Sequence, residues 1–424
     1  FPYLAAKYGG GIFLLIYILL ALTFGYTMIV AETSLGRMTR KSPVGAFASF
    51  TKSHTLKAGG WINAIIPILI VPYYSVIGGW VIKYLFEYIC GNGTKLAEDG
   101  YFSMFISDGV SAEICFIVFA LITLTIIFAG VRNGIERVSK FMMPILVVLS
   151  VIIAIYSVTR PGALKGIQYF LVPNLENFSW MTVVSAMGQM FYSLSIAMGI
   201  LVTFGSYMKK ETSIENSTRN VEVFDTAIAI MAGLMIIPAV FAFSGGDPNT
   251  LQAGPSLMFI TIPKVFASMG LGTVVGILFF VLVLFAAVTS SIALTESAVS
   301  TFEDELHWNR KKSTVVIGII MLALGTLSSL GYGPLDAVKI LGMQFLDFFD
   351  FLTNSVMMPI AAIATCLLVS RVIGVDRIEE EMTQEGGTFR RKKIFVMMIK
   401  YLCPVFAAII LISSVMNAFG LISM

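Results

Sequence analysis

The 424 residues carry too few charges for a water-soluble protein of this length. Hydrophobic residues make up 57% of the chain and charged residues 12%, and the mean hydropathy is +0.88. A typical soluble domain has about twice that charged fraction. The net charge of +3 is dispersed over several loops, which excludes a concentrated nucleic-acid-binding patch. The composition predicts a helical membrane protein with the lipid bilayer, and no nucleic acid, as a partner.

Apolar runs long enough to cross a bilayer, which takes about 20 residues, define the predicted helices. They are 12–36, 61–88, 112–130, 140–158, 179–207, 222–243, 272–301, 313–331, 344–370 and 394–418. No linker separates them, so we expect a single transmembrane domain over 1–424. Residues 1–11 are typical of the late part of another apolar helix, and the chain has no initiator Met. We therefore expect that a preceding half-helix is missing from this sequence.

Basic residues alternate between the predicted connections and set the orientation. The loops within 37–57, 132–140, 209–219, 310–312 and 371–393 hold twenty Lys and Arg, against five in the opposite loops. This asymmetry places the basic loops in the cytoplasm. The outer connection 244–271 contains an apolar, Pro-broken segment at 256–266, for which we expect a re-entrant or lid-like hairpin rather than an ordinary surface loop.

Polar side chains within the apolar runs are informative, because each needs a cavity or a partner in the bilayer. In 188–199, Gln189, Ser193 and Ser195 lie among small residues, which indicates a helix that unwinds and frees its carbonyl groups to bind a cation. Packing of small residues between helices is the alternative. The consecutive hydroxyls of Thr289, Ser290 and Ser291 are suitable Na⁺ ligands, although such hydroxyls often bond only to the preceding helical turn.

Four carboxylates fall inside apolar runs: Asp225, Glu32, Glu296 and Asp350. Asp225 has no Lys or Arg within helical reach, which favours a cation, a proton or another special partner. For Glu296, a hydrogen bond between helices or a position at a helix end is as consistent with the sequence as function.

Aromatic residues also fall at the predicted centre of the protein. Tyr73 and Tyr74 lie in the middle of 61–88, and Tyr192 lies in the predicted break. A buried tyrosine hydroxyl needs a partner, and a substrate carboxylate is a natural one, although simple packing is the more common role.

Taken together, these segments resemble the neurotransmitter:sodium symporter family. The resemblance is carried by 1–11, 32–37, 72–80, 188–193, 204–207 and 289–306, in the family's order and spacing. It implies an all-α polytopic membrane protein with the LeuT fold, which is a 5+5 inverted repeat plus one further helix, here without its first half-helix. The implied activity is sodium-coupled amino-acid symport, so we expect a transporter of the cell inner membrane and not an enzyme.

The resemblance also implies roles for particular residues. The first sodium site takes Ser193 and Asp225, and the second takes the Ala286 carbonyl with the hydroxyls of Thr289 and Ser290. Tyr74 binds the substrate carboxylate, Tyr192 closes over the substrate, and Glu32 braces the unwound backbone. The side-chain pocket consists of Ile70, Ile77, Ser195, Met198, Ser290 and Leu294. The outer gate has Gln189 and Asp350, and the inner gate has Tyr207 and Asp304.

These apolar pocket residues predict a neutral L-amino acid with a large apolar or aromatic side chain, such as tyrosine or tryptophan. Chloride-dependent relatives bind the anion near Tyr17, Gln189, Ser193 and a serine one turn after Asp225. Here that turn carries Ala229, and Asp225 supplies a fixed negative charge. We therefore expect transport without chloride.

The sequence leaves the coupled ion, the oligomeric state and the conformation open. A proton-coupled amino-acid permease of the same fold is the alternative function, and the sequence indicates no oligomeric state. The missing half-helix suggests a displaced segment that opens the inner side, unless the sequence is simply trimmed. In that state Tyr207 and Asp304 would be released from the inner gate, and the outer side would be closed over Tyr74 and Tyr192.

Overall fold

The computed structural model describes residues 1–245 and 255–421, and within those ranges the chain forms helices and loops but no β-strand. The helices of the first half are α1 (Pro2–Lys7), α2 (Gly11–Leu20), η1 (Ala21–Gly25), α3 (Tyr26–Thr39), α4 (Pro43–Phe50), α5 (His54–Ile89), α6 (Gly93–Leu96), α7 (Tyr101–Ser107), α8 (Gly109–Phe128), η2 (Val131–Glu136), α9 (Arg137–Val158), α10 (Ala163–Leu171), η3 (Leu175–Asn177), α11 (Trp180–Ser193) and α12 (Ile200–Tyr207). Those of the second half are α13 (Ile214–Ser244), η5 (Leu257–Thr261), α14 (Ile262–Ala267), α15 (Gly272–Leu306), α16 (Arg310–Leu330), α17 (Phe345–Asp350), η6 (Phe351–Met357), α18 (Met358–Leu367), η7 (Leu368–Ile373), α19 (Val375–Thr383), η8 (Gln384–Gly386), α20 (Lys392–Met397), η9 (Met398–Leu402) and α21 (Cys403–Ala418).

Nine of the ten predicted spans correspond to continuous membrane-length helical segments in the described residues. These are Gly11–Thr39, His54–Ile89, Gly109–Phe128, Val131–Val158, Ile214–Ser244, Gly272–Leu306, Arg310–Leu330, Phe345–Ile373 and Lys392–Ala418. The tenth, 179–207, is divided into α11 and α12. The sequence therefore predicted these nine segments and the one that is interrupted.

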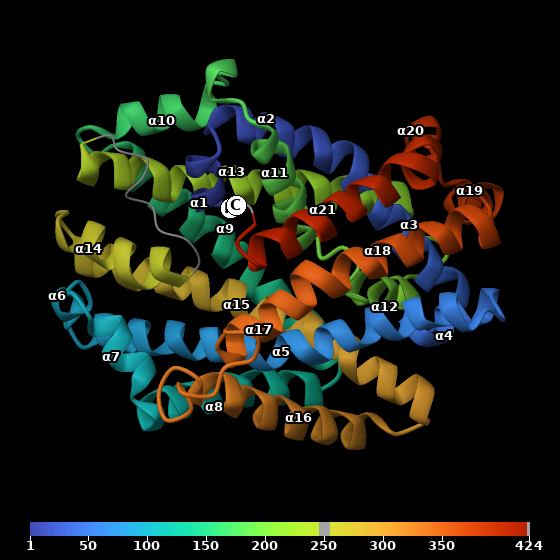
Figure 1. Ribbon diagram of the computed structural model, residues 1–424, viewed down its shortest axis with the longest axis horizontal. Helices are drawn as coiled ribbons and strands as arrows, with labels where there is room; N and C mark the ends of the chain where they lie inside the picture. The colour runs from blue at the N-terminus through green and yellow to red at the C-terminus, as the bar shows by residue number, and fades with distance from the viewer. Residues whose placement is uncertain (246–254, 422–424) are drawn as a thin grey trace.

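The long helices α5 and α15 form the centre of the bundle. They pack against each other, and α5 also contacts α8 and α16, while α12 packs against α3. Figure 1 shows these helices running roughly along the long axis of the molecule. Fully buried aromatic residues, among them Trp80, Tyr84 and Phe116, fill the space between them. The α12 half of the broken helix thus lies against both α3 and α15, whereas α11 packs against α2 and α21.

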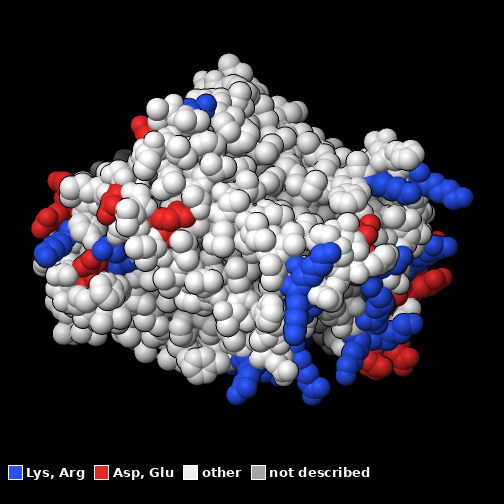
Figure 2. Space-filling view, turned by 90° about the horizontal axis from the view of Figure 1, so that it is seen from below, with Lys and Arg blue, Asp and Glu red and all other residues white. Residues whose placement is uncertain are grey.

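The charged side chains divide the molecule into two unlike ends. Figure 2 shows most of the blue Lys and Arg side chains of that face gathered at one end, which in Figure 1 carries α4, α19 and α20. The basic loops predicted to be cytoplasmic therefore lie together, as the positive-inside rule requires. We refer to this end as the cytoplasmic end.

The predicted hairpin in 244–271 is only partly within the described residues, because 246–254 lie outside them. Residues 257–267 form η5 and α14, which are too short to span a membrane. Tyr84 of α5 donates a hydrogen bond to the Phe259 carbonyl at 2.8 Å. Lys264 pairs with Asp99 at 2.5 Å, and this hydrogen bond lowers the pKa of the Asp99 carboxyl. The segment is thus tied to the outer ends of its neighbours.

Candidate functional site

The interruption between α11 and α12 lies at 194–199. Helix α11 begins with a capping box between Ser179 and Thr182, and it ends at Ser193. Ser195 and Ala197 then adopt positive φ angles of 55° and 58°, a conformation that costs L-residues about 1–2 kcal/mol each. The surrounding structure must hold such a backbone in place. The predicted unwinding is therefore present in the structure.

Two contacts hold the unwound segment. The Ala197 N–H donates to Oε1 of Glu32, which is fully buried in α3, at 2.9 Å. Gly199 has a φ of 70°, and a Cβ there would lie 2.7 Å from the carbonyl oxygen of Asn63. A side chain at position 199 would thus push α12 away from α5. Glu32 contacts the backbone that the family resemblance assigned to it.

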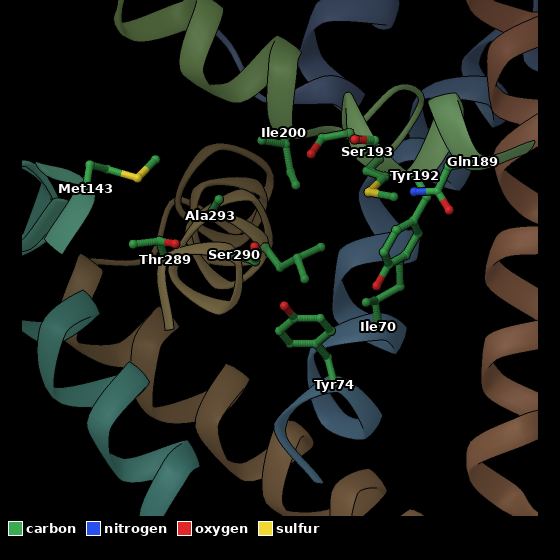
Figure 3. A pocket seen from close by; sticks show the side chains of 13 residues that line it. Ile70, Tyr74, Met143, Gln189, Tyr192, Ser193, Ile200, Thr289, Ser290 and Ala293 are labelled. Carbon is green, nitrogen blue, oxygen red and sulfur yellow. The ribbon is translucent and has the colours of Figure 1, made fainter. Parts of the chain in front are cut away.

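A cavity of about 410 Å³ lies beside the break. Its walls come from α5, α9, α11, the break, the start of α12 and α15: Ile70, Tyr74, Met143, Gln189, Tyr192, Ser193, Ser195, Met198, Ile200, Thr289, Ser290, Ala293 and Leu294. Figure 3 shows the rings of Tyr74 and Tyr192 pointing into this space. None of the lining residues carries a charge, so the cavity suits a neutral side chain.

One predicted pocket residue, Ile77, does not line the cavity. It lies three positions beyond Tyr74 toward the outer end of α5 and packs against the hydrophobic core. The other predicted pocket residues line the cavity, and the assignment of Ile77 to the substrate pocket stays a prediction.

Asp225 of α13 receives two hydroxyl hydrogen bonds from other helices. The Tyr17 hydroxyl of α2 donates to Oδ2 at 2.6 Å, and the Ser193 hydroxyl donates to Oδ1 at 2.5 Å. Neither donor carries a positive charge. Ala229, one turn further along α13, is 6% exposed and offers no donor. The residues predicted for the first sodium site are thus in direct contact at the end of α11.

The three consecutive hydroxyls of α15 face different surroundings. Thr289 and Ser290 line the cavity, whereas the Ser291 hydroxyl is buried and lies 3.0 Å from that of Thr123 in α8. The Thr289 hydroxyl donates to the carbonyls of Phe285 and Ala286, at 3.0 Å each. This is the bond to the preceding turn that the sequence left as an alternative. It also places the Thr289 and Ala286 oxygens side by side, as a shared cation ligand set would need.

The predicted inner-gate residues are held by different partners. Tyr207 donates to Oε1 of Glu296 at 2.7 Å, and Asp304 accepts a hydrogen bond from the Ser42 N–H. The expected release of both residues from the inner gate stays a prediction. Glu296 is fully buried, so its carboxylate requires donors, and Arg310 supplies two more at 3.0 and 2.5 Å. Glu296 therefore links α15 to α12 and α16.

The predicted outer-gate residues have different surroundings. Asp350 accepts hydrogen bonds from Tyr73 at 3.2 Å and from Asn354 at 2.6 Å, whereas Gln189 lines the cavity. The side chain of Tyr192 is 40% exposed. Its ring extends into the cavity (Figure 3), and its closure over the substrate stays a prediction.

Comparison with known proteins shows the family. The sodium:neurotransmitter symporter family matches residues 1–94 and 103–421. The chain belongs to this family. It is 32% identical to the uncharacterized sodium-dependent transporter YhdH of Bacillus subtilis, over all of this chain and 93% of YhdH. It is 30% identical to an uncharacterized sodium-dependent transporter of Haemophilus influenzae, over 98% of this chain and 92% of that protein.

A solved structure shows the same fold. The crystal structure of MhsT in complex with L-phenylalanine matches this sodium:neurotransmitter symporter with a TM-score of 0.86 and 33% sequence identity, over 97% of this chain and 93% of MhsT. The predicted all-α LeuT fold is thereby confirmed. The chain is a multi-pass, sodium-dependent symporter and not an enzyme, and family membership sets aside the proton-coupled permease.

Sequence reasoning missed three residues of the symporter's cavity: Met143, Ile200 and Ala293. Ala293 follows Ser290 by one helical turn, so the helical period was a usable signal. Ile200 directly follows the break, where the backbone turns back into the helix. Met143 comes from α9, and a methionine inside an apolar run carries no signal of its own.

Proposed function

We propose that this symporter carries a neutral L-amino acid with a large apolar or aromatic side chain, such as tyrosine or tryptophan, into the cell together with sodium. The observation that carries the proposal is the cavity beside the unwound segment. It combines an uncharged lining with the tyrosine hydroxyl of Tyr74, and its volume of about 410 Å³ is within the usual range for small-molecule sites. The solved MhsT structure, which is similar over nearly its whole length, contains L-phenylalanine, a ligand of this class.

The residues divide into three functions in this proposal. Tyr74 donates to the substrate carboxylate, and backbone N–H groups of the unwound segment, whose residues Ser195 and Met198 line the same cavity, assist it in this proposal. Ile70, Met198 and Leu294 contact the substrate side chain, and the unbranched thioether of Met198 adapts to rings of different shape. Tyr192 closes over the substrate, with Gln189 beside it. Specificity then comes from excluding charged side chains, which would lose their hydration without gaining a partner.

Sodium is proposed to bind on both sides of the substrate. Ser193, Asp225 and the substrate carboxylate supply oxygens to one ion, so that this ion and the substrate stabilise each other. The Ala286 carbonyl with the hydroxyls of Thr289 and Ser290 supplies oxygens to the other. Uncharged and anionic oxygens of these kinds are suitable ligands for a hard cation. Occupation of both sodium sites would lower the free energy of the substrate-bound state. This would couple the sodium gradient to the gradient of the amino acid.

Chloride is not required in this proposal, because Asp225 already provides the negative charge. Tyr17 and Ser193, two of the groups that would bind the anion in chloride-dependent relatives, instead donate to Asp225 at 2.6 and 2.5 Å. An added anion would face a carboxylate in a medium of low dielectric constant, a repulsion of several kcal/mol. The site of action in this proposal is the cell inner membrane.

A competition assay tests the substrate class. The protein is reconstituted into liposomes with an inward sodium gradient, and uptake of labelled tyrosine is measured against an excess of each unlabelled amino acid. Tryptophan, phenylalanine and leucine should compete, whereas glycine, arginine and glutamate should not. If arginine or glutamate outcompetes every aromatic amino acid, the proposed substrate class is wrong.

A further inference from the structure

A second groove, separate from the transport cavity, lies at the cytoplasmic end of α13. It has a volume of about 550 Å³ and is formed by α13, by α2 with η1, and by the residues just before α20. All three elements belong to membrane-spanning segments or directly adjoin them. Leu22 and Val223, which line the groove, are 44% and 60% exposed. In a membrane these side chains would face lipid.

The groove changes from charged to apolar along one face of α13. Arg219 lies at its cytoplasmic end, and Val223, Ala227 and Ile230 follow at intervals of three or four residues, which places them on the same face. Ile18, from α2, adds to the apolar part. From Arg219 to Ile230 the helix rises by about 16 Å. This order matches a lipid whose polar head is in the cytoplasmic interface and whose acyl chain enters the bilayer.

The two carboxylates of the groove are buried and already paired. Glu222 is 2% exposed and accepts two hydrogen bonds from Arg391, at 2.9 and 2.6 Å. Glu215 is 5% exposed and accepts a hydrogen bond from Tyr26 at 2.6 Å. The Arg391 guanidinium also lies 3.7 Å from the centre of the Tyr26 ring. These contacts make a rigid floor and keep both negative charges away from the groove's opening.

Arg219 and Arg390 are exposed at the mouth of the groove. Within the described residues, neither lies within 4.0 Å of an acidic side chain. With Glu215 and Glu222 buried, the charge presented to the membrane surface is positive. Guanidinium groups bind phosphate oxygens through paired N–H donors, which suits them to a phospholipid head group.

We propose that this groove binds an anionic phospholipid of the cytoplasmic leaflet. The phosphate lies against Arg219 and Arg390, and one acyl chain lies along Ile18, Leu22, Val223, Ala227 and Ile230. Basic pockets between transmembrane helices on the cytoplasmic side are a general means of binding such head groups. The bound lipid would join α2, α13 and the start of α20, and it does not depend on the identity of the transported substrate.

Native mass spectrometry of the purified full chain in detergent, titrated with phosphatidylglycerol or phosphatidylcholine, tests the proposal. The wild type should bind its first phosphatidylglycerol at least tenfold more tightly than phosphatidylcholine. The variant Arg219→Gln/Arg390→Gln should lose this preference, and Arg219→Lys/Arg390→Lys should keep most of it. Arg132→Gln/Arg137→Gln removes two exposed cytoplasmic arginines outside the groove and should bind like the wild type.

Two further measurements distinguish a phospholipid from other occupants of the groove. Ala227→Trp fills the apolar part without changing the charge and should weaken phosphatidylglycerol binding about tenfold, whereas inorganic phosphate should not compete. Melting curves in phosphatidylcholine check that each variant is folded. Unchanged binding in the folded Arg219→Gln/Arg390→Gln variant would overturn the proposal. Displacement of bound phosphatidylglycerol by inorganic phosphate would also overturn the proposal. Loss of a dimer in Ala227→Trp without any change in lipid binding would overturn it too, because it would identify a second copy of the chain as the occupant.

Discussion

The hydroxyl of Tyr17 donates a hydrogen bond to Asp225 over a distance of 2.6 Å, which joins α2 to α13 inside the membrane. Ser193, at the end of α11, donates to the other oxygen of the same carboxylate. A single half-buried acid thus connects three transmembrane segments beside the transport cavity. The proposed sodium dependence and chloride independence both rest on this carboxylate.

Removing the fixed charge should make transport depend on chloride. The double variant Asp225→Asn/Ala229→Ser loses the carboxylate and gains a hydroxyl donor one turn away. Uptake by the wild type should be equal in chloride and gluconate, while uptake by the double variant should fall at least fivefold in gluconate. Ala229→Ser alone is the control and should behave as the wild type, because Asp225 still repels an anion. A large loss of wild-type uptake in gluconate would contradict the proposal.

Removing two hydroxyls of α15 should raise the sodium requirement. In Thr289→Ala/Ser290→Ala, one sodium ion loses two oxygen ligands, and the sodium concentration for half-maximal uptake should rise about tenfold or more. Ser291→Ala is a matched control on the same helix, because its hydroxyl contacts Thr123 rather than the cavity. A wild-type sodium curve in the double variant would show that these residues do not form the site.

Removing one cavity hydroxyl should weaken substrate binding. Tyr74→Phe loses a donor to the substrate carboxylate, and hydrogen bonds to charged groups contribute about 1.5–3 kcal/mol, so KM should rise about 10- to 100-fold. The neighbouring Tyr73 does not line the cavity, and its hydroxyl contacts Asp350. Tyr73→Phe should therefore leave KM within about threefold. Equal effects of the two substitutions on KM would argue against a direct contact between Tyr74 and substrate.

Breaking the half-buried ion pair between Glu296 and Arg310 at the cytoplasmic end should lower stability. Glu296→Gln leaves Arg310 without its main partner, and breaking a buried pair in this way costs about 3–5 kcal/mol. The detergent-solubilised variant should melt at a clearly lower temperature than the wild type. Glu303, at 3.6 Å from Arg310, is more exposed, so Glu303→Gln should change the melting temperature much less. Identical melting curves for both variants would show that Glu296 is not the main partner of Arg310.

The fold was predictable because membrane helices follow from local properties. Span length, apolar composition and the distribution of Lys and Arg are all visible in a single sequence. The broken helix was predictable for a similar reason, since 188–199 combines small and polar residues at a depth where they are costly. The backbone geometry at Ser195 and Ala197 was not, because positive φ angles at these residues depend on contacts such as that with Glu32.

The types of residue that form the site were predictable from the sequence, but the side chains that each of them contacts were less so. Thr289 and Ser290 were recognisable as possible ligands, but only the fold shows that Ser291 turns away toward Thr123, 168 positions distant in the chain. Met143 was missed because the other residues that line the cavity lie on other helices, far from it in the sequence. The donors to Glu296 were likewise hidden, since Tyr207 and Arg310 lie on separate helices.

The most direct test of the central claim is accumulation of labelled tryptophan by proteoliposomes under an imposed sodium gradient. With sodium outside and potassium inside, the internal tryptophan concentration should rise transiently above the external one, and collapse of the gradient by a sodium ionophore should abolish this accumulation. An imposed proton gradient without sodium should give only background uptake. Accumulation driven by protons alone, or uptake of tryptophan that is the same with and without sodium, would contradict sodium-coupled amino-acid symport by this protein.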